Sequence, residues 1–567
     1  MIRDSPNTSQ SQLNAGFFAR SEGLILVSLL LLLAVLKVFY AIVLRIDSDE
    51  TQHLHVVWGW ANGFLPYRDL FDNHSPLFQF LYAPLFGALG ERPDILVPMR
   101  LAVIPLYFLC LWAVYKCGTM LFSRRVGIWS AIAAGAFPVF FIKSSEFRTD
   151  DLWAALWLLS IWMLLLRPLK TSNVFLSGLV LGACFATSMK TILLAVALVL
   201  AVTLLVTGKA ICQEKVNWRS LLVAAMSGFL GVAVVPLLVV AFFGLNGALP
   251  SLYYCTIQDN VLPGLFSWSG VWRQSRWFLP LGALISILGY LNWRNLPEMF
   301  RRDRAAVIAL TLLAYFVLLA GFWPIVQTQD FIPVIPLIIL LLVGAGTIAP
   351  LARYQLISFP LFVGAEIIVL LSTFPPRGDA MADKLSMISN VLTLTTKEDF
   401  VMDAKGETVF RRRPFYYVLE GVTLRRIALG LIKDDIPERL IATRAPVATL
   451  LRMPPRAMDF IRHNYVQVAF RTCVLGKILA TQDENFPKTY EFDVAVPERY
   501  VLLPKRGPLV ATLDGSPFGA ARFLQTGHHR VQVFANTGRL ALIWARAAEK
   551  HFSPFGPIVK DEFGPAD

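Results

Sequence analysis

Long apolar stretches follow one another along the first two thirds of the chain. They cover residues 23–44, 97–121, 126–142, 152–166, 174–189, 191–207, 220–243, 278–291, 305–323, 331–348 and 355–374. A run of about 18 or more apolar residues with few charges is typical of a helix that crosses a bilayer. The pattern predicts a multi-span α-helical membrane protein with about eleven transmembrane helices.

The first apolar stretch is predicted to be a permanent span rather than a cleaved signal peptide. Residues 1–20 are mostly polar, with Arg3 and Arg20 as their only bases. The stretch that follows is longer than the ~7–15 residues of a signal peptide's apolar region, and no small-residue cleavage site ends it.

Composition agrees with a membrane location. Of the 567 residues, 56% are hydrophobic and 16% are charged, against about 45–50% and about 25% in soluble domains. The net charge of +13 would suggest nucleic acid in a soluble protein. Here bases in cytoplasmic loops and contacts with anionic lipids account for it, so we expect a lipid bilayer and no nucleic acid as partner.

Basic residues gather in the short segments that join the apolar stretches on one side. If the N-terminus is cytoplasmic, the cytoplasmic connections are Ser123–Arg125, Arg167–Lys170, Gly208–Arg219, Asn292–Arg304 and Leu351–Gln355. Short, base-rich connections are typical of the cytoplasmic side. The longer connections 45–96 and 143–151 and the tail from Pro375 then face the periplasm. We therefore expect a multi-pass protein of the bacterial inner membrane.

The stretch RIDSDETQHLHVVWGW, residues 45–60, follows the first predicted span and carries three carboxylates, Asp47, Asp49 and Glu50. Charges beside hydrocarbon are costly and usually functional. Asp49 stands three residues before Gln52, which is the spacing of a capping box, and capping is the usual role of such an Asp. A cap accounts for one acid and leaves two that need another role.

The residues after these acids have helical periodicity. Leu54, Val57, Trp58 and Ala61 recur at the spacing of one apolar helix face, and tryptophan is common at headgroup level. The pattern predicts an amphipathic helix at the membrane interface. The two histidines of this helix either line a site or lie on its surface, and the sequence leaves both alternatives open.

A second group of charges lies at the start of the fourth predicted span. The stretch KSSEFRTDDLWAALW contains Glu146, Arg148, Asp150 and Asp151. One of the two aspartates is expected to cap the helix. The predicted orientation puts both acidic groups on the same side of the membrane, where they could converge on one site.

Such a site suits transfer chemistry at a phosphate. A positioned carboxylate can take a proton from an attacking hydroxyl, and paired carboxylates, here Asp150 and Asp151, can hold a divalent cation such as Mg or Mn beside a phosphate. The nearby bases Arg148, His74 and Lys190 can bind a phosphate directly. Lys190 lies on a short hairpin that the orientation above puts on the periplasmic side.

Three motifs together resemble a known superfamily. They are DSDE after the first span, GFLPYRDLFDNHSPLFQFLYAPLF in the same loop, and RTDD before the fourth span. They resemble the GT-C membrane glycosyltransferases, and in particular the bacterial relatives of dolichyl-phosphate-mannose protein mannosyltransferase and of the lipid A aminoarabinose transferase. The resemblance covers residues 45–85 and 146–152 and extends more loosely to Phe374.

The resemblance implies a GT-C type fold and an activity. The donor is a polyprenyl-phosphate sugar, and the acceptor is a hydroxyl of a lipid, glycan or protein, so the enzyme is a hexosyl- or pentosyltransferase. Asp49 takes the place of the general base, with Glu50 or Asp47 as alternatives. Asp150 and Asp151 take the place of donor or metal contacts.

The chain departs from the aminoarabinose branch at one motif. That branch has a Lys-Pro-Pro-Leu element in the first loop, where this chain has His74-Ser75-Pro76-Leu77. The lysine is missing, which argues against an aminoarabinose donor.

The chain is expected to have two domains. Residues 1–374 form the membrane domain, with loops 45–96 and 143–151 carrying the site. Residues 375–567 form a soluble periplasmic α+β domain that ends in a small β-sandwich-like part, since short strand patterns with Gly turns follow 498. DFVMD and ETVF around AKG, residues 399–410, are expected to pair as a hairpin.

Two other classes compete with an enzyme. A polytopic transporter or flippase for a lipid-linked glycan would place its polar residues near the bilayer midplane, whereas here the apolar stretches hold almost no acids except Glu366. A scaffold that presents the tail would leave both acidic groups unexplained. The positions of the acids favour chemistry at the membrane boundary.

Overall fold

The computed structural model describes residues 8–166, 170–213, 217–262, 268–276, 303–347, 355–376, 380–483 and 485–556. The chain divides into two compact units, and each is described by itself. Unit 1 consists of Met1–Leu44, Asn73–Phe78 and Val97–Gly378, and unit 2 of Arg45–Asp72, Gln79–Leu96 and Asp379–Asp567.

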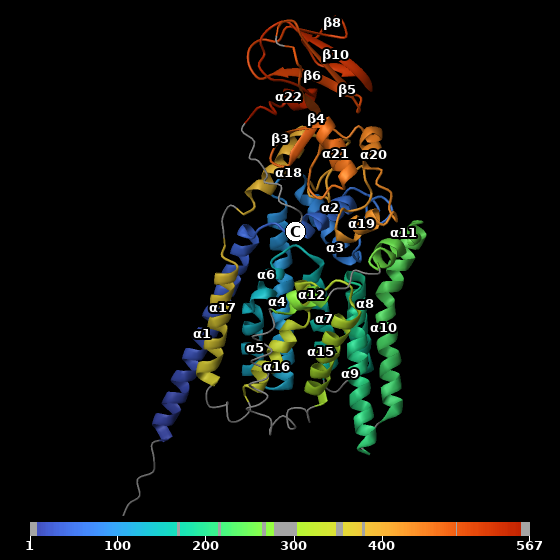
Figure 1. The fold of residues 1–567 in the computed structure, drawn as a ribbon. Helices are drawn as coiled ribbons and strands as arrows, with labels where there is room; N and C mark the ends of the chain where they lie inside the picture. The colour runs from blue at the N-terminus through green and yellow to red at the C-terminus, as the bar shows by residue number, and fades with distance from the viewer. Residues whose placement is uncertain are drawn as a thin grey trace, which may run out of the picture. The chain divides into compact units, whose positions relative to one another are not determined.

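Unit 1 is a bundle of apolar helices that run alongside one another (Figure 1). Its described helices are α1 (Thr8–Val43), α4 (Leu96–Leu121), α5 (Arg124–Ala136), α6 (Pro138–Lys143), α7 (Thr149–Leu165), α8 (Thr171–Thr187), α9 (Thr191–Ile211), α10 (Trp218–Leu245), α11 (Leu249–Tyr253), α12 (Trp268–Ser275), α15 (Asp303–Phe322), α16 (Ile335–Ala345) and α17 (Gln355–Thr373). Among the residues that the structure describes, five helices are long and apolar enough to cross a membrane. The prediction of several apolar helices is confirmed.

The predicted apolar stretches fall on these helices, with two qualifications. The stretch 278–291 lies outside the described residues. The stretch 126–142 is divided between α5 and α6, because Pro138 cannot donate a helical hydrogen bond and holds Phe137 in an extended conformation, with ψ 119°. The second half of this stretch thereby becomes a separate short helix that leads into the loop before α7.

Hydrogen bonds between helices fix the end of α7 that carries the acidic motif. The Trp153 indole N–H donates to Thr191 Oγ1 at 3.0 Å, which ties α7 to the first residue of α9. About two turns further along α7, Ser160 and Ser177 exchange hydrogen bonds between α7 and α8. Small polar residues of this kind join helices inside a membrane bundle.

Unit 2 joins the first loop to the C-terminal region. Its helices are α2 (Ser48–Ala61), most of α3 (Leu77–Leu89), α18 (Ala382–Leu394), α19 (Gly421–Ala428), α20 (Ile436–Thr443), α21 (Pro455–Asn464) and α22 (Ala545–Glu549). Apolar side chains from the helices and strands between Val391 and Ala547 form a core separate from that of unit 1.

The strands of unit 2 form two sheets. They are β1 (Val401–Met402), β2 (Val447–Ala448), β3 (Tyr465–Ala469), β4 (Thr472–Leu479), β5 (Lys488–Val494), β6 (Glu498–Pro504), β7 (Ala511–Leu513), β8 (Ser516–Pro517), β9 (Arg522–Leu524), β10 (Gly527–Val533) and β11 (Leu540–Trp544). One sheet has the order β1-β2-β4-β11-β6-β9, with β3 also paired to β4, and the other has the order β5-β10-β7-β8. The expected combination of helices and sheets in the C-terminal region is confirmed.

The predicted hairpin around residues 399–410 is wrong. Val401 and Met402 pair with Val447 and Ala448 in parallel instead. The segment after them forms a compact loop, because the Asp403 carboxylate accepts hydrogen bonds from the loop's own N–H groups. Aspartate side chains commonly compete with strand pairing in this way.

Candidate active site

The first acidic group begins α2. Asp47 is the N-cap: its Oδ1 accepts a hydrogen bond from the Asp49 N–H at 2.9 Å, and the Asp47 N–H donates to Glu50 Oε2 at 2.9 Å. The predicted capping box of Asp49 and Gln52 is therefore wrong. The helix begins two residues earlier because Asp47 and Glu50 have the same three-residue spacing and cap each other reciprocally.

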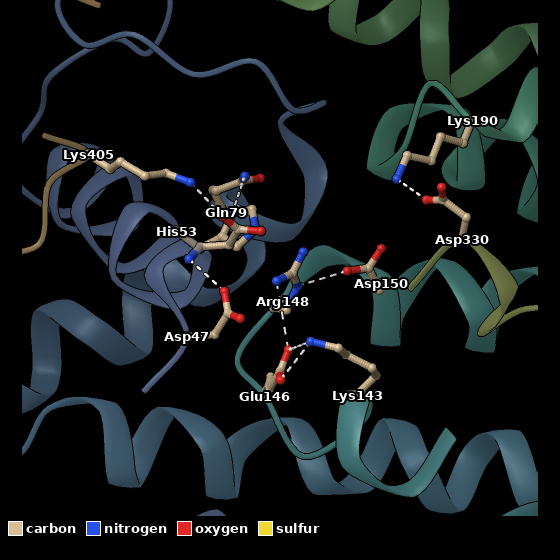
Figure 2. A network of polar contacts seen from close by, with 11 residues as sticks. Asp47, His53, Gln79, Lys143, Glu146, Arg148, Asp150, Lys190, Asp330 and Lys405 are labelled. Atoms are coloured by element: carbon tan, nitrogen blue, oxygen red, sulfur yellow. Dashed lines mark hydrogen bonds and ion pairs between the residues drawn. The ribbon is translucent and has the colours of Figure 1, made fainter. Parts of the chain in front are cut away.

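The carboxylate of Asp49 has a different partner. Its Oδ1 lies 2.5 Å from the Nζ of Lys405, whose ammonium is also 3.4 Å from Glu420 Oε2. Figure 2 labels Lys405. Burial lowers the pKa of Lys405, but Asp49 and Glu420 outweigh burial and raise it above its ordinary value, so the amine stays charged. Sequence analysis missed Lys405.

Helix α2 is enclosed by unit 2 rather than amphipathic. Every residue from Glu50 to Gly59 is buried, including the polar side chains of Gln52, His53 and His55. The His55 Nδ1–H donates to the carbonyl of Val409 at 2.8 Å. The prediction of an interfacial helix is therefore wrong for this segment, because chain from the C-terminal region covers its polar face.

A second polar contact joins α2 to α3 through His53 and Gln79. Gln79 of α3 donates from Nε2 to Asp72 Oδ2 at 3.1 Å and lies 3.4 Å from His53 Nδ1. All three side chains are fully buried. His53 and His55 thus both have buried polar neighbours, so neither lies on an exposed helix surface.

The second acidic group forms a chain of ion pairs before and within the first turn of α7. Lys143 Nζ is 2.9 Å from both carboxylate oxygens of Glu146. Arg148 lies between Glu146, at 3.7 Å, and Asp150, at 3.0 Å (Figure 2). The four side chains link the end of α6 to the start of α7 and hold cations and carboxylates together.

The predicted cap of α7 is not found. Its N-cap is Arg148, which makes no side-chain capping bond, and Asp150 and Asp151 both lie in the first turn. Carboxylates in the first turn are favoured by the helix dipole. Neither acid is therefore needed as a cap.

Asp151 lies apart from the ion pairs, inside the helix bundle. It is buried, and within the described part of the chain neither of its carboxylate oxygens has a hydrogen-bond partner. Its electrostatic partner is Lys37 of α1, whose Nζ donates to the carbonyl of Phe141 at 2.8 Å and to Ser144 Oγ at 2.6 Å. Lys37 is a second cation that sequence analysis missed, although it interrupts the first apolar stretch.

Lys190 pairs with an acid that sequence analysis did not select. It precedes α9 and forms an ion pair with Asp330 of the 3₁₀ turn η3 (Thr328–Phe331), as Figure 2 shows. Asp330 is fully buried, and its Oδ2 also accepts the Gln327 N–H at 2.8 Å. The Tyr315 hydroxyl donates to the Asp330 carbonyl at 2.6 Å.

His74 is half-buried in the segment of unit 1 between α2 and α3. The neighbouring carbonyl of Asn73 accepts a hydrogen bond from Asn260 Nδ2 at 3.0 Å, which attaches this segment to the chain after α11.

The residues described here are not arranged as metal ligands. No three of their His, Cys, Asp or Glu side chains come together to hold an ion. Asp150 is already paired with Arg148, and Asp151 has Lys37 as its electrostatic partner.

The predicted site residues thus form two groups. Asp47, Asp49 and Glu50 belong to unit 2, together with Lys405. The remaining ones, Arg148, Asp150, Asp151, Lys190 and His74, belong to unit 1. Asp47, Asp49 and Glu50 are joined by hydrogen bonds or ion pairs within unit 2, and Arg148, Asp150 and Lys190 form ion pairs within unit 1.

Comparisons with known proteins concern the family and the fold. The family model described as dolichyl-phosphate-mannose-protein mannosyltransferase matches residues 73–238. The fold is similar to ArnT from Cupriavidus metallidurans in the apo state, with 14% identity and a TM-score of 0.56 over 81% of this chain and 98% of that one. The same protein bound to undecaprenyl phosphate matches with 15% identity and a TM-score of 0.56 over 79% and 97%. No curated protein matches the sequence significantly.

Proposed function

We propose that this chain is a membrane glycosyltransferase of the GT-C superfamily and that it transfers a sugar from a polyprenyl-phosphate donor to an acceptor hydroxyl. The family-model match over residues 73–238 and the fold support this proposal. The acceptor is a lipid, a glycan or a protein. The likeness to a protein solved with undecaprenyl phosphate supports a donor of this kind.

Asp49 is the proposed general base. The observation that supports this role most directly is that Asp47 and Glu50 are used by the capping box, whereas the Asp49 carboxylate is not. Asp49 is also partly exposed, with 27% of its side chain accessible. Glu50 is fully buried, so it is a weaker candidate for contact with a substrate.

The reaction is a single displacement at the anomeric carbon. The acceptor oxygen forms the new bond to that carbon, the bond to the phosphate oxygen breaks, and the polyprenyl phosphate leaves with the electron pair. The hydroxyl proton passes to Asp49, because an alcohol is too weak an acid to lose it unaided at neutral pH. The displacement inverts the anomeric configuration.

The donor phosphate is assigned to the cations of unit 1. Arg148 and Lys190 are held by Glu146, Asp150 and Asp330, and an incoming phosphate would exchange with these carboxylates as an anionic partner. His74 is the third proposed phosphate ligand. Asp150 and Asp151 are proposed to contact the donor sugar.

The membrane arrangement belongs to the same proposal. We assign about eleven spans, a cytoplasmic N-terminus, the site to the periplasmic side of a bacterial inner membrane, and residues 375–567 to the periplasm. A membrane-impermeant thiol reagent tests this orientation. The reagent should label an Arg456→Cys variant in intact spheroplasts. Labelling that occurs only after membrane lysis would show that the tail has the opposite orientation, facing the cytoplasm.

The activity is tested in a deletion strain of the source organism. Mass spectrometry of its surface glycans and lipids should reveal the unmodified acceptor. Wild-type protein should restore the product, and Asp49→Asn should not, although it should insert and keep its thermal stability. Asp459→Asn, an exposed acid of the same unit, is the matched control and should restore it fully.

The same strain separates the alternatives. If the chain is a transporter or flippase for a lipid-linked glycan, Asp49→Asn should leave the intact lipid-linked precursor on the cytoplasmic side, because the precursor is no longer moved across the membrane. An enzyme would accumulate the precursor on the periplasmic side. Addition of EDTA to the transfer assay, followed by Mg or Mn, tests the predicted divalent cation.

A further inference from the structure

We propose that Lys405 is a positioning residue for Asp49, and that its ammonium holds the Asp49 carboxylate ionised and oriented toward the acceptor hydroxyl. The inference rests on the proposed function of Asp49 and deepens it. It assigns a part of the site to the C-terminal region, 356 residues away in the sequence.

The contact itself is close and asymmetric. Lys405 Nζ lies 2.5 Å from Asp49 Oδ1, and only 2% of the lysine side chain is exposed, against 27% of the aspartate. The cation is thus enclosed by protein while the carboxylate remains accessible. A buried ammonium donates without competition from water, and an accessible carboxylate can still receive a substrate.

The backbone on both sides of Lys405 is fixed. The Arg413 guanidinium donates to the carbonyls of Asp403 and Ala404 at 2.8 and 2.9 Å. The Lys405 N–H donates to Glu407 Oε2 at 2.9 Å, and the Gly406 N–H donates to Asp403 Oδ1 at 2.6 Å. Because these hydrogen bonds fix the backbone at Lys405, they also restrict the position that its ammonium can take.

The loop around Lys405 also packs against α2 at fixed points. Gly406 has φ +84°, and a Cβ there would lie 2.6 Å from the His55 Cβ, so the loop approaches the helix more closely than any other residue would allow. The His55 hydrogen bond to Val409 adds a second fixed point. Two contacts on α2 thus set where Lys405 meets the first turn of that helix.

The charged groups around Lys405 and Asp49 determine how removal of Lys405 would change the pKa of Asp49. Asp49 shares its helix turn with Asp47 and Glu50, and from the C-terminal region Glu420 and Arg452 also interact with Lys405. Loss of the ammonium would remove the cation in contact with Asp49, while Lys384, which interacts with Asp47 and Glu50, and Arg452 are the other cations of this group. A carboxylate that loses an adjacent cation is protonated at higher pH, by about one to three pH units.

A lysine that only braces the loop would not produce this effect. Its loss would change stability but would leave the pH at which transfer falls off unchanged. The acidic limb of the rate–pH profile reports the base itself. The pH profile therefore distinguishes a positioning residue from a purely structural one.

The experiment measures initial transfer rates between pH 4.5 and 8.5 with detergent-purified protein and membranes of the deletion strain as the source of donor and acceptor. Lys405→Met should lower the rate at pH 7 by tenfold or more and move the acidic limb upward by about one unit or more. Lys405→Arg should return the limb toward the wild-type position. Arg456→Met, which removes an exposed cation from an ion pair in the same unit, should leave it unchanged.

A second variant keeps the test decisive if Lys405→Met does not fold. Glu420→Gln removes the carboxylate that competes with Asp49 for Lys405. The acidic limb of the rate–pH profile of this variant should therefore move to lower pH. A limb at the wild-type position in the folded Lys405→Met protein, or in Glu420→Gln, would overturn the role of Lys405. Full transfer by Asp49→Asn would instead overturn the proposed base, so the two failures are distinguishable.

Discussion

Lys190 and Asp330 form an ion pair between the start of α9 and the turn before α16, across 140 residues of sequence. Asp330 is fully buried, and the pair lies beside Tyr315, whose hydroxyl binds the Asp330 carbonyl. The proposed phosphate ligand Lys190 is therefore also part of the packing of the helix bundle. The two roles can be separated by measurement.

Lys190→Met should destabilise unit 1 strongly. Removal of one partner of a buried pair leaves an uncompensated charge, here Asp330, at a cost of about 3 kcal/mol. The measurement is thermal unfolding in detergent.

Lys209→Met is the control for this prediction, since Lys209 and Asp303 form a partly exposed pair between α9 and α15, and exposed pairs are worth less than about 1 kcal/mol. Equal losses in the two variants would contradict the structural role of the Lys190 pair. A Lys190 variant that keeps wild-type donor affinity after correction for folding would remove Lys190 from the phosphate ligands.

Lys37 and Asp151 should behave as a coupled pair. Lys37→Met leaves Asp151 buried without its cation, so it should cost about 3 kcal/mol of unfolding free energy. The double variant with Asp151→Asn should recover more than half of this loss, because neither residue then carries an uncompensated charge. Strictly additive losses in the same unfolding assay would show that the two side chains do not interact.

Asp47 should act mainly through the helix start. Asp47→Ala should cost about 1 kcal/mol of stability, whereas Asp47→Asn should cost only a few tenths, since asparagine caps helices as well as aspartate. Chemical denaturation of the detergent-solubilised protein measures both values. A loss from Asp47→Asn as large as that from Asp47→Ala would mean that the charge, and not the cap, is what the structure uses.

His55 should give unit 2 a pH-dependent stability. Burial lowers the pKa of His55, although Asp403 and the hydrogen bond to Val409 act in the opposite direction. A group whose folded pKa is lowered stabilises the fold above its unfolded pKa, about 6.5, and loses that contribution as pH falls. The wild-type protein should therefore lose more stability than His55→Gln between pH 7.5 and 5.5.

Thermal unfolding at the two pH values checks this prediction. The comparison between the proteins matters, because other buried groups near His55, such as Glu407, titrate in both. Parallel losses in wild type and variant would show that His55 does not titrate with folding.

The helices were predictable because their information is local. Apolar side chains repeat over each span, and the stretches 97–121 and 220–243 correspond closely to α4 and α10. The division of 126–142 at Pro138 could not be predicted from the proline alone, because α4 and α10 continue through Pro105 and Pro236. The helix start at Asp47 was missed because two capping patterns overlap there, and only the backbone decides between them.

The partners of the charged residues could not be predicted in this way. Lys405 meets Asp49, and Lys190 meets Asp330, only after distant segments pack together, and no spacing rule connects them. The loop around Lys405 looked like a hairpin because its flanks are rich in strand-forming residues. Its hydrogen bonds to Asp403 and Arg413 outweigh that local preference.

The enclosure of α2 has a consequence for how the protein is made. Asp49 emerges from the ribosome early, but Lys405 follows 356 residues later, which is roughly 20–70 s at about 5–20 residues per second. During that interval the first loop lacks the chain that covers His55. The polar face of α2 therefore stays uncovered until the last third of synthesis supplies the chain that buries it.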